Sequence, residues 1–147
     1  MKIVNQAIEL QTQKEFDFID LTEKVENILL ASQIQNGLLN VQTLHTTVSL
    51  FLNENEPLLL EDFKNHLKRL FPKDLAYNHN DFSRRTANMH ENECKNAHSH
   101  CQAVHLPSNL TLNVIGGKLQ LGQWQRVFLV ELDQAKLRRV QIQIMGE

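Results

Sequence analysis

The sequence predicts one α+β domain over residues 1–147, with a mainly antiparallel or mixed sheet and two or three helices. Two segments carry apolar residues at helical spacing, whereas the strand-like segments are β-branched or alternate between apolar and polar residues. The mixed order of helices and strands argues against a parallel sheet built from βαβ units. Hydrophobic residues at 41% and charged residues at 22% are ordinary for a globular domain of this length.

The first half of the chain predicts a strand, a helix and one or two further strands. Residues Ile3 to Leu10 are rich in Ile and Val and predict a strand. Between Thr22 and Asn36 apolar residues recur at helical spacing, which predicts a helix. Asp20 or Thr22 is suited to cap its start, and Gly37 is suited to end it in the left-handed conformation. The β-branched run from Leu38 to Leu52 predicts one long strand or two.

A second helix is predicted from Pro57 to Leu70, because proline suits the first helical position and an apolar stripe follows it. The polar segment from Lys73 to Glu93 lacks a clear period, which is typical of a functional or mobile segment. Asn96 to Leu106 predicts a short helix.

Strand-like segments fill the last third of the chain. They are Leu110 to Ile115, Leu119 to Leu132 and Leu137 to Met145. Gly116-Gly117 between the first two is a two-residue hairpin signal. In the last segment, apolar residues from Val140 onward alternate with polar ones, so one face is expected to be buried.

Composition and charge exclude several classes of protein. Fifteen Lys and Arg against seventeen Asp and Glu give a formal charge of −2, so the basic surface of a nucleic-acid-binding protein is missing. No apolar run approaches the roughly 20 residues of a membrane helix, and Met1 to Leu10 lacks the apolar region of a signal peptide. Two cysteines are too few for a disulfide scaffold. We therefore expect a cytoplasmic protein that binds neither nucleic acid nor a membrane.

Histidines are the clearest chemical signal. The chain has seven, and five of them fall between residues 79 and 105, while His45 lies in a threonine-rich segment. Imidazole is the commonest metal ligand and titrates near neutral pH. On a strand His98 and His100 would share a face, but on a helix they diverge by about 200°, so only one points into a given site. The histidines predict either a polar, metal-binding pocket or a set of solvated surface side chains.

Carboxylates and arginines provide further candidates. Asn53 to Glu56, which includes Glu54, suits either acid–base and metal-ligand roles or a solvated turn that caps the following helix. Arg84-Arg85 in the polar segment, Arg126 after the tryptophan and Arg138-Arg139 in the last strand are suited to receive a phosphate group, although Arg139 is also explained as the wet face of that strand. These residues alone predict a polar pocket and no particular reaction.

Several ordered blocks stand out between about residue 40 and the end of the chain. They are His45-Thr46-Thr47 with the following SLFLNEN, Tyr77 to Asp81, Asn96 to His100, Gly117 to Gln125, and the tail from Arg138 to Glu147. This set resembles the YjbQ-like family of secondary thiamine-phosphate synthases. One departure is Leu106-Pro107 in place of the usual Leu-Gly, which alters a turn because proline cannot take a positive φ.

The resemblance implies a small α+β protein that forms a homotrimer, with a pocket near the subunit boundaries. It implies a divalent metal ion, zinc or magnesium, held by His45, His79, His98 and His100. Glu54 and Gln125 are implied as further polar groups of the pocket. The catalytic candidates are therefore His45, Glu54 and His100. The candidates for binding a phosphorylated small molecule are Arg84, Gln125 and Arg126.

The implied reaction joins a pyrimidine methyl diphosphate to a thiazole phosphate and expels pyrophosphate, whose charge a metal ion or cationic groups must stabilise. Residues 117–122 fit G-x-x-x-x-G, but Gln123 and Trp124 follow where a P-loop has Lys and Ser or Thr. The expectation is therefore a weak transferase. Two alternatives stay open, a non-catalytic metal- or ligand-binding oligomer and a metal-dependent hydrolase in which Glu54 acts as the base.

Overall fold

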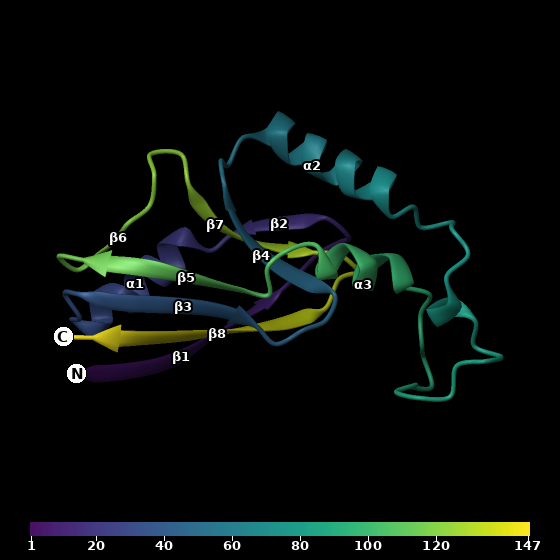
Figure 1. Ribbon diagram of the computed structural model, residues 1–147, viewed down its shortest axis with the longest axis horizontal. Helices are drawn as coiled ribbons and strands as arrows, with labels where there is room; N and C mark the ends of the chain where they lie inside the picture. The colour runs from purple at the N-terminus through teal and green to yellow at the C-terminus, as the bar shows by residue number, and fades with distance from the viewer.

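Two antiparallel sheets share one apolar core in the computed structural model, which describes residues 1–147 (Figure 1). In chain order the elements are β1 (Lys2–Gln11), β2 (Asp17–Asp20), α1 (Thr22–Ser32), β3 (Gly37–Thr43), β4 (Val48–Asn53), α2 (Pro57–Leu70), the short 3-10 helix η1 (Asn78–Asn80), α3 (Ala97–Val104), β5 (Asn109–Ile115), β6 (Lys118–Leu119), β7 (Arg126–Glu131) and β8 (Leu137–Gly146). The larger sheet has the strand order β1-β8-β3-β5-β6, and the smaller one has the order β2-β7-β4. Every strand pairing is antiparallel, which confirms the predicted α+β class.

The core is centred on β8, which lies between β1 and β3. Val140, Ile142 and Ile144 are at most 1% exposed, while the residues between them face outward, which confirms the predicted alternation. Leu50 of β4 and Leu129 of β7 are completely buried in the same cluster. Burial of these side chains joins the two sheets, since apolar surface removed from water stabilises the fold by about 25 cal/mol per Å².

Helix α1 begins where the backbone N–H of Thr22 donates to Asp20 Oδ1 at 2.9 Å. It buries Val25 and Leu29, among others, against the core. The helix ends at Ser32 because Gln33 takes the left-handed conformation with a φ of 60°. The prediction that Gly37 ends this helix is wrong. Gly37 instead starts β3, where a Cβ atom would overlap the backbone oxygen of Met145.

Helix α2 begins at Pro57 and ends at Leu70, as predicted. The Glu56 carboxylate accepts hydrogen bonds from the backbone N–H groups of Leu58 and Leu59 at 2.9 and 2.8 Å, and so caps its first turn. The helix lies on the outer side of the smaller sheet (Figure 1). Leu67 is its one buried residue.

The run from Leu38 to Leu52, predicted as one long strand or two, forms two, β3 and β4, which belong to different sheets. The run from Leu119 to Leu132 is interrupted by an exposed turn in which Trp124 is 64% exposed. Gly116-Gly117 forms the expected hairpin turn, with φ values of 58° and 71°. Strand β2 was not predicted, because four half-buried residues carry no readable alternation.

The polar segment between α2 and α3 extends from the end of the molecule opposite the two termini (Figure 1). Its one regular element is η1, and the predicted short helix follows as α3. Residues of this segment and of the β3–β4 connection line the same pocket. None of the helices combines the length and the apolar composition needed to cross a membrane.

Candidate functional site

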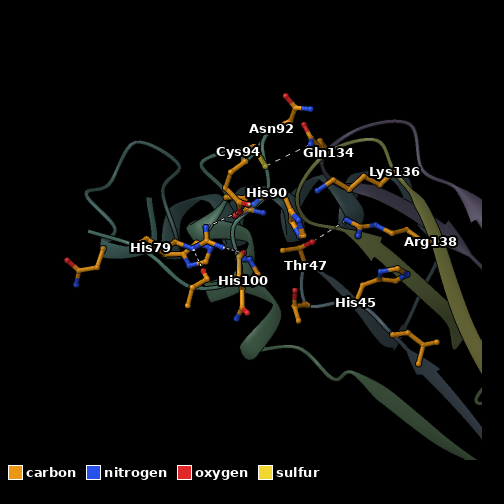
Figure 2. Close-up of a pocket in the computed structure, with 18 residues that line it drawn as sticks. His45, Thr47, His79, His90, Asn92, Cys94, His100, Gln134, Lys136 and Arg138 are labelled. Carbon is orange, nitrogen blue, oxygen red and sulfur yellow. Dashed lines mark hydrogen bonds and ion pairs between the residues drawn. The ribbon is translucent and has the colours of Figure 1, made fainter. Parts of the chain in front are cut away.

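A polar pocket of about 990 Å³ opens where four parts of the chain meet: the β3–β4 connection, the β7–β8 connection, the start of α3 and the polar segment before it (Figure 2). Three of its 18 lining residues are hydrophobic. Its titratable lining residues are His45, His79, Arg85, His90, Glu93, Cys94, His100, Lys136 and Arg138. The pocket is therefore suited to a strongly polar ligand.

His45 is held in one tautomer. The β3–β4 connection brings it over β8, where its Nε2 atom accepts a hydrogen bond from the backbone N–H of Arg139 at 2.8 Å. Because Nε2 accepts, the proton of the neutral ring is on Nδ1. Burial lowers the pKa of His45, and the nearby Arg138 and Lys136 lower it further. His45 is therefore a neutral hydrogen-bond donor at neutral pH.

Thr47 lines the pocket and is oriented by a buried ion pair. Arg138 donates from Nε to Glu131 Oε2 at 2.6 Å and from a terminal nitrogen to Thr47 Oγ1 at 3.2 Å. Thr12 Oγ1 also donates to Glu131 Oε2, at 2.9 Å. Since Thr47 Oγ1 accepts from Arg138, the hydroxyl hydrogen of Thr47 is free to donate elsewhere. Two neighbouring groups of the β3–β4 connection, His45 and Thr47, are thus hydrogen-bond donors.

The opposite wall is held together by Arg85. Its guanidinium donates to Glu93 Oε1 at 2.9 Å and to the backbone oxygens of Ala87 and Asn88 at 3.3 and 2.8 Å. The other carboxylate oxygen of Glu93 accepts from the backbone N–H of His90 at 3.2 Å. The hydrogen bond from Arg85 lowers the pKa of Glu93. These bonds fix a polar segment that has little apolar contact of its own.

His79 and His100 form a pair of imidazoles in this wall, with ring centroids 4.8 Å apart (Figure 2). They are positioned by a joint between η1 and α3, in which the backbone N–H of Ala97 donates to Asn80 Oδ1 at 3.1 Å. Burial lowers the pKa of His100, and the neighbouring His79 lowers it further. The neutral His100 ring is therefore able to accept a proton.

Asp133 organises the side of the pocket nearest Cys94. It receives hydrogen bonds from Lys136 Nζ at 2.6 Å and from Asn96 Nδ2 at 3.1 Å. Although burial opposes its charge, these two bonds lower the pKa of Asp133. The Cys94 Sγ atom lies 3.9 Å from the same carboxylate. Burial raises the pKa of the Cys94 thiol, and Asp133 raises it further.

The structure brings His45, His79 and His100 to one pocket and directs His98 away from it. Both His98 and His100 lie on α3, where a separation of two residues turns their side chains about 200° apart. His98 is buried, with Nε2 3.3 Å from Glu15 Oε1. No three His, Cys, Asp or Glu side chains lie close enough to hold a metal ion. The predicted four-histidine metal site is therefore wrong.

Four other predicted site residues lie outside the wall of the pocket. They are Glu54, Arg84, Gln125 and Arg126. Arg126 Nε instead donates to Asp20 Oδ2 at 2.8 Å. Gln125 Oε1 accepts from the backbone N–H of Gly122 at 2.8 Å. The side chains of Arg126 and Gln125 are therefore engaged in hydrogen bonds outside the pocket.

Sequence reasoning missed several residues of the pocket, among them Thr47, Asn96 and Lys136. Thr47 belongs to the block that begins with His45, and Asn96 belongs to the block that ends with His100. In both blocks the histidine was recognised as a candidate and its neighbour was not. Lys136 follows β7 in a short connection with no motif around it. It is positioned by its ion pair with Asp133 and by hydrogen bonds between its backbone and Thr12.

Comparisons with known proteins identify the fold family. The family model described as UPF0047 protein YjbQ-like matches residues 6–147. The chain belongs to the YjbQ-like family. A UPF0047 protein of Methanothermobacter thermautotrophicus is 37% identical over 147 residues, which cover 100% of this chain and 95% of that protein. The UPF0047 protein YjbQ of Salmonella typhimurium is 33% identical over 113 residues, which cover 76% of this chain and 72% of that one.

Solved structures of YjbQ-like proteins agree with this assignment. A YbjQ-like protein of unknown function from Sulfolobus solfataricus has a TM-score of 0.89 and 32% identity, covering 99% of each chain. A hypothetical protein from Aeropyrum pernix has a TM-score of 0.86 and 32% identity, covering 98% of this chain and 99% of that one.

The expectation of thiamine-phosphate synthesis is wrong. The YjbQ-like family is described without an activity, and the Sulfolobus relative is described as a protein of unknown function. The metal-dependent alternatives also lose their basis, because the histidines are not gathered into a metal site. The chemistry of the pocket has to be inferred from its own donors and acceptors.

Proposed function

We propose that the pocket binds a small phosphorylated molecule and that its phosphate lies against the β3–β4 connection. The observation that carries this proposal is the fixed polarity of His45, whose Nε2 accepts from the backbone N–H of Arg139 at 2.8 Å and whose Nδ1 must therefore donate. Thr47 beside it has its hydroxyl hydrogen free, since its oxygen accepts from Arg138. Adjacent donors without acceptors favour an anionic ligand.

The charges around the pocket support the same ligand. The lining has three cationic side chains, Arg85, Lys136 and Arg138, and one carboxylate, Glu93. The carboxylates of Glu131 and Asp133, which offset two of the cations, do not line the pocket. The counterions of Lys136 and Arg138 therefore lie behind them, while Arg85 is paired with Glu93 within the lining. Such an arrangement favours a phosphate over a cation.

Calorimetric titration of the full chain with inorganic phosphate and with sulfate tests this proposal. The variant His45→Gln is the sharpest, because Gln Oε1 can still accept from the backbone of Arg139 while the Nδ1 donor is lost. We expect His45→Gln to weaken sulfate binding by about tenfold, the value of one hydrogen bond to a charged group. Gln125→Ala, outside the pocket, is the control and is expected to bind like the wild type. If neither anion binds at concentrations of about 10 mM, the proposal is wrong.

The protonation of the pocket provides a second readout. A bound anion raises the pKa values of His45 and His100, so binding takes up protons and strengthens as the pH falls. Sulfate is the suitable probe because its own charge stays constant near neutral pH. We expect tighter sulfate binding at about pH 6 than at about pH 8.

Acid–base catalysis is a second candidate function, and the contact between His79 and His100 favours it. Burial keeps the His100 ring neutral in the absence of a ligand, as a general base requires. A screen of phosphorylated compounds by phosphorus NMR tests this function with the wild type and His100→Gln. Conversion that disappears in His100→Gln supports it. The absence of conversion by the wild type, or equal conversion by both proteins, contradicts it.

Assembly and location complete the proposal. On the family resemblance we propose a homotrimer in the cytoplasm, with the turn that carries Trp124 at or near a subunit interface. The indole is 64% exposed, and an exposed tryptophan is typical of a protein interface. Sedimentation velocity of the wild type tests the trimer, which a purely monomeric protein would contradict.

A further inference from the structure

Asn96 leaves a buried acceptor in the wall of the pocket. Its side chain is 7% exposed, and its Oδ1 atom has no hydrogen-bond partner in the protein. Buried polar atoms in native proteins have partners with few exceptions, because an unpaired one loses its hydration without compensation. Because Asn96 lines the pocket, a donor from a ligand or from an ordered water can satisfy this atom.

The orientation of the Asn96 amide is fixed by Asp133. The Nδ2 group of Asn96 donates to Asp133 Oδ2 at 3.1 Å, and an ionised carboxylate can only accept. Lys136 Nζ, 2.6 Å from the same oxygen, stabilises that ionised state. Exchanging the two ends of the amide would bring Oδ1 against the carboxylate. Oδ1 is therefore the end of the amide that faces away from Asp133.

We propose that the ligand of this pocket carries a hydroxyl group that donates a hydrogen bond to Asn96 Oδ1, so that its preferred ligands are hydroxylated phosphate esters. This inference rests on the proposed function, which supplies the phosphate. Asn96 is then a specificity-determining residue, because it selects among phosphate esters by the group at their other end.

His79 favours a hydroxyl group over an ammonium group as the donor. Its Nε2 atom is also buried without a partner. His79 and Asn96 flank the joint between Asn80 and Ala97, in which the backbone N–H of Ala97 donates to Asn80 Oδ1 at 3.1 Å. A hydroxyl group both donates and accepts, so it can pair with the imidazole nitrogen in either tautomer, whereas an ammonium group only donates. Surroundings that lower the pKa of His100 also disfavour a ligand cation.

Calorimetry with three phosphates tests the inference: inorganic phosphate, glycerol 3-phosphate and n-propyl phosphate. The two esters have similar size and charge, and only the first carries hydroxyl groups. We expect the wild type to bind glycerol 3-phosphate about tenfold more tightly than n-propyl phosphate, the value of one hydrogen bond to a buried partner. Asn96→Ala should lose this preference while keeping its affinity for inorganic phosphate. Asn92→Ala, which removes an exposed amide from the same pocket, should retain the preference.

The outcomes separate this inference from the function on which it rests. Equal binding of both esters by the wild type overturns the inference but not the proposed phosphate site. An undiminished preference for glycerol 3-phosphate in Asn96→Ala has the same consequence. If the wild type binds none of the three phosphates, the proposed function and the inference both fail. The comparison of esters on the wild type needs no variant, so it decides the matter even if Asn96→Ala does not fold.

Discussion

Arg138 and Glu131 form a bidentate ion pair inside the protein, with side chains that are 5% and 0% exposed. The pair joins the two sheets, because Glu131 ends β7 in the smaller sheet and Arg138 lies on β8 in the larger one. Thr12 and Thr47 complete its hydrogen bonds from either side. Through Thr47 this buried pair reaches the wall of the pocket, so the site is attached to the part of the core where the sheets meet.

Removing one partner of this pair is expected to destabilise the protein strongly. Arg138→Met leaves the Glu131 carboxylate buried without its counterion, at a cost of about 3–5 kcal/mol. Replacement of both residues by apolar ones should cost less than either single change, because no buried charge remains. Denaturant unfolding measures both, with Lys64→Met in the exposed pair with Glu61 as the control that leaves the midpoint nearly unchanged. A small effect of Arg138→Met would show that water reaches Glu131.

Gly37→Ala is expected to disrupt the junction of β3 and β8. An added Cβ would overlap the backbone oxygen of Met145, which cannot move without breaking the strand pairing. We expect a loss of about 2 kcal/mol or more in the free energy of unfolding. Gly122→Ala is the matched control, since its Cβ would lie 3.4 Å from the flexible side chain of Gln125. Equal stability of the two variants in thermal unfolding would contradict this account.

The elements predicted from the sequence are those whose pattern is local. Strand β8 alternates along its length, and α2 has a proline start and an apolar stripe, so both were recognised. The role of Gly37 was misread, because the need for glycine comes from the approach of Met145, a strand partner far along the chain. The division of residues 38–52 into two sheets likewise depends on which strands lie next to each half.

The functional site was likewise predictable only where the sequence pattern is local. The 200° rule for neighbouring histidines on a helix accounts for His100 facing the pocket while His98 faces Glu15. The alternation of β8 places Arg139 on its outer face and Arg138 on the buried face, but the buried partner of Arg138, Glu131, lies on another strand and was not predictable. Interpreting the histidines as metal ligands failed because no third ligand lies near any pair of them.

Stability is expected to depend on pH near neutrality through His45 and His100. Burial lowers both pKa values in the folded protein from an ordinary value of 6.5, so the unfolded chain binds more protons below that pH. The contribution of these two groups to the free energy of unfolding should therefore be complete above about pH 7 and decrease as the pH falls from about 7 to about 5. Asp20 and Asp133 do not contribute in this range, since their pKa values are lowered from 3.8.

Chemical denaturation at several pH values measures this dependence. The double variant His45→Gln and His100→Gln should show a shallower slope than the wild type, because the two groups that resist protonation are gone. His66→Gln, which removes an exposed histidine on α2, should keep the wild-type slope. The account is wrong if the wild type is as stable at about pH 5 as at about pH 7.5.

Cys94 is expected to be a slow nucleophile. Burial raises the pKa of its thiol and the carboxylate of Asp133, 3.9 Å away, raises it further, so little thiolate is present at neutral pH. In a Cys101→Ser background, where Cys94 is the remaining thiol, alkylation by iodoacetamide should be slower than that of a free cysteine. Asp133→Asn should accelerate it several-fold, since the repelling charge is lost while Lys136 stays nearby. Alkylation of both proteins at the rate of free cysteine would show that the polar segment opens faster than the reagent reacts, and that the wall of the pocket is not held closed by Arg85 and Glu93.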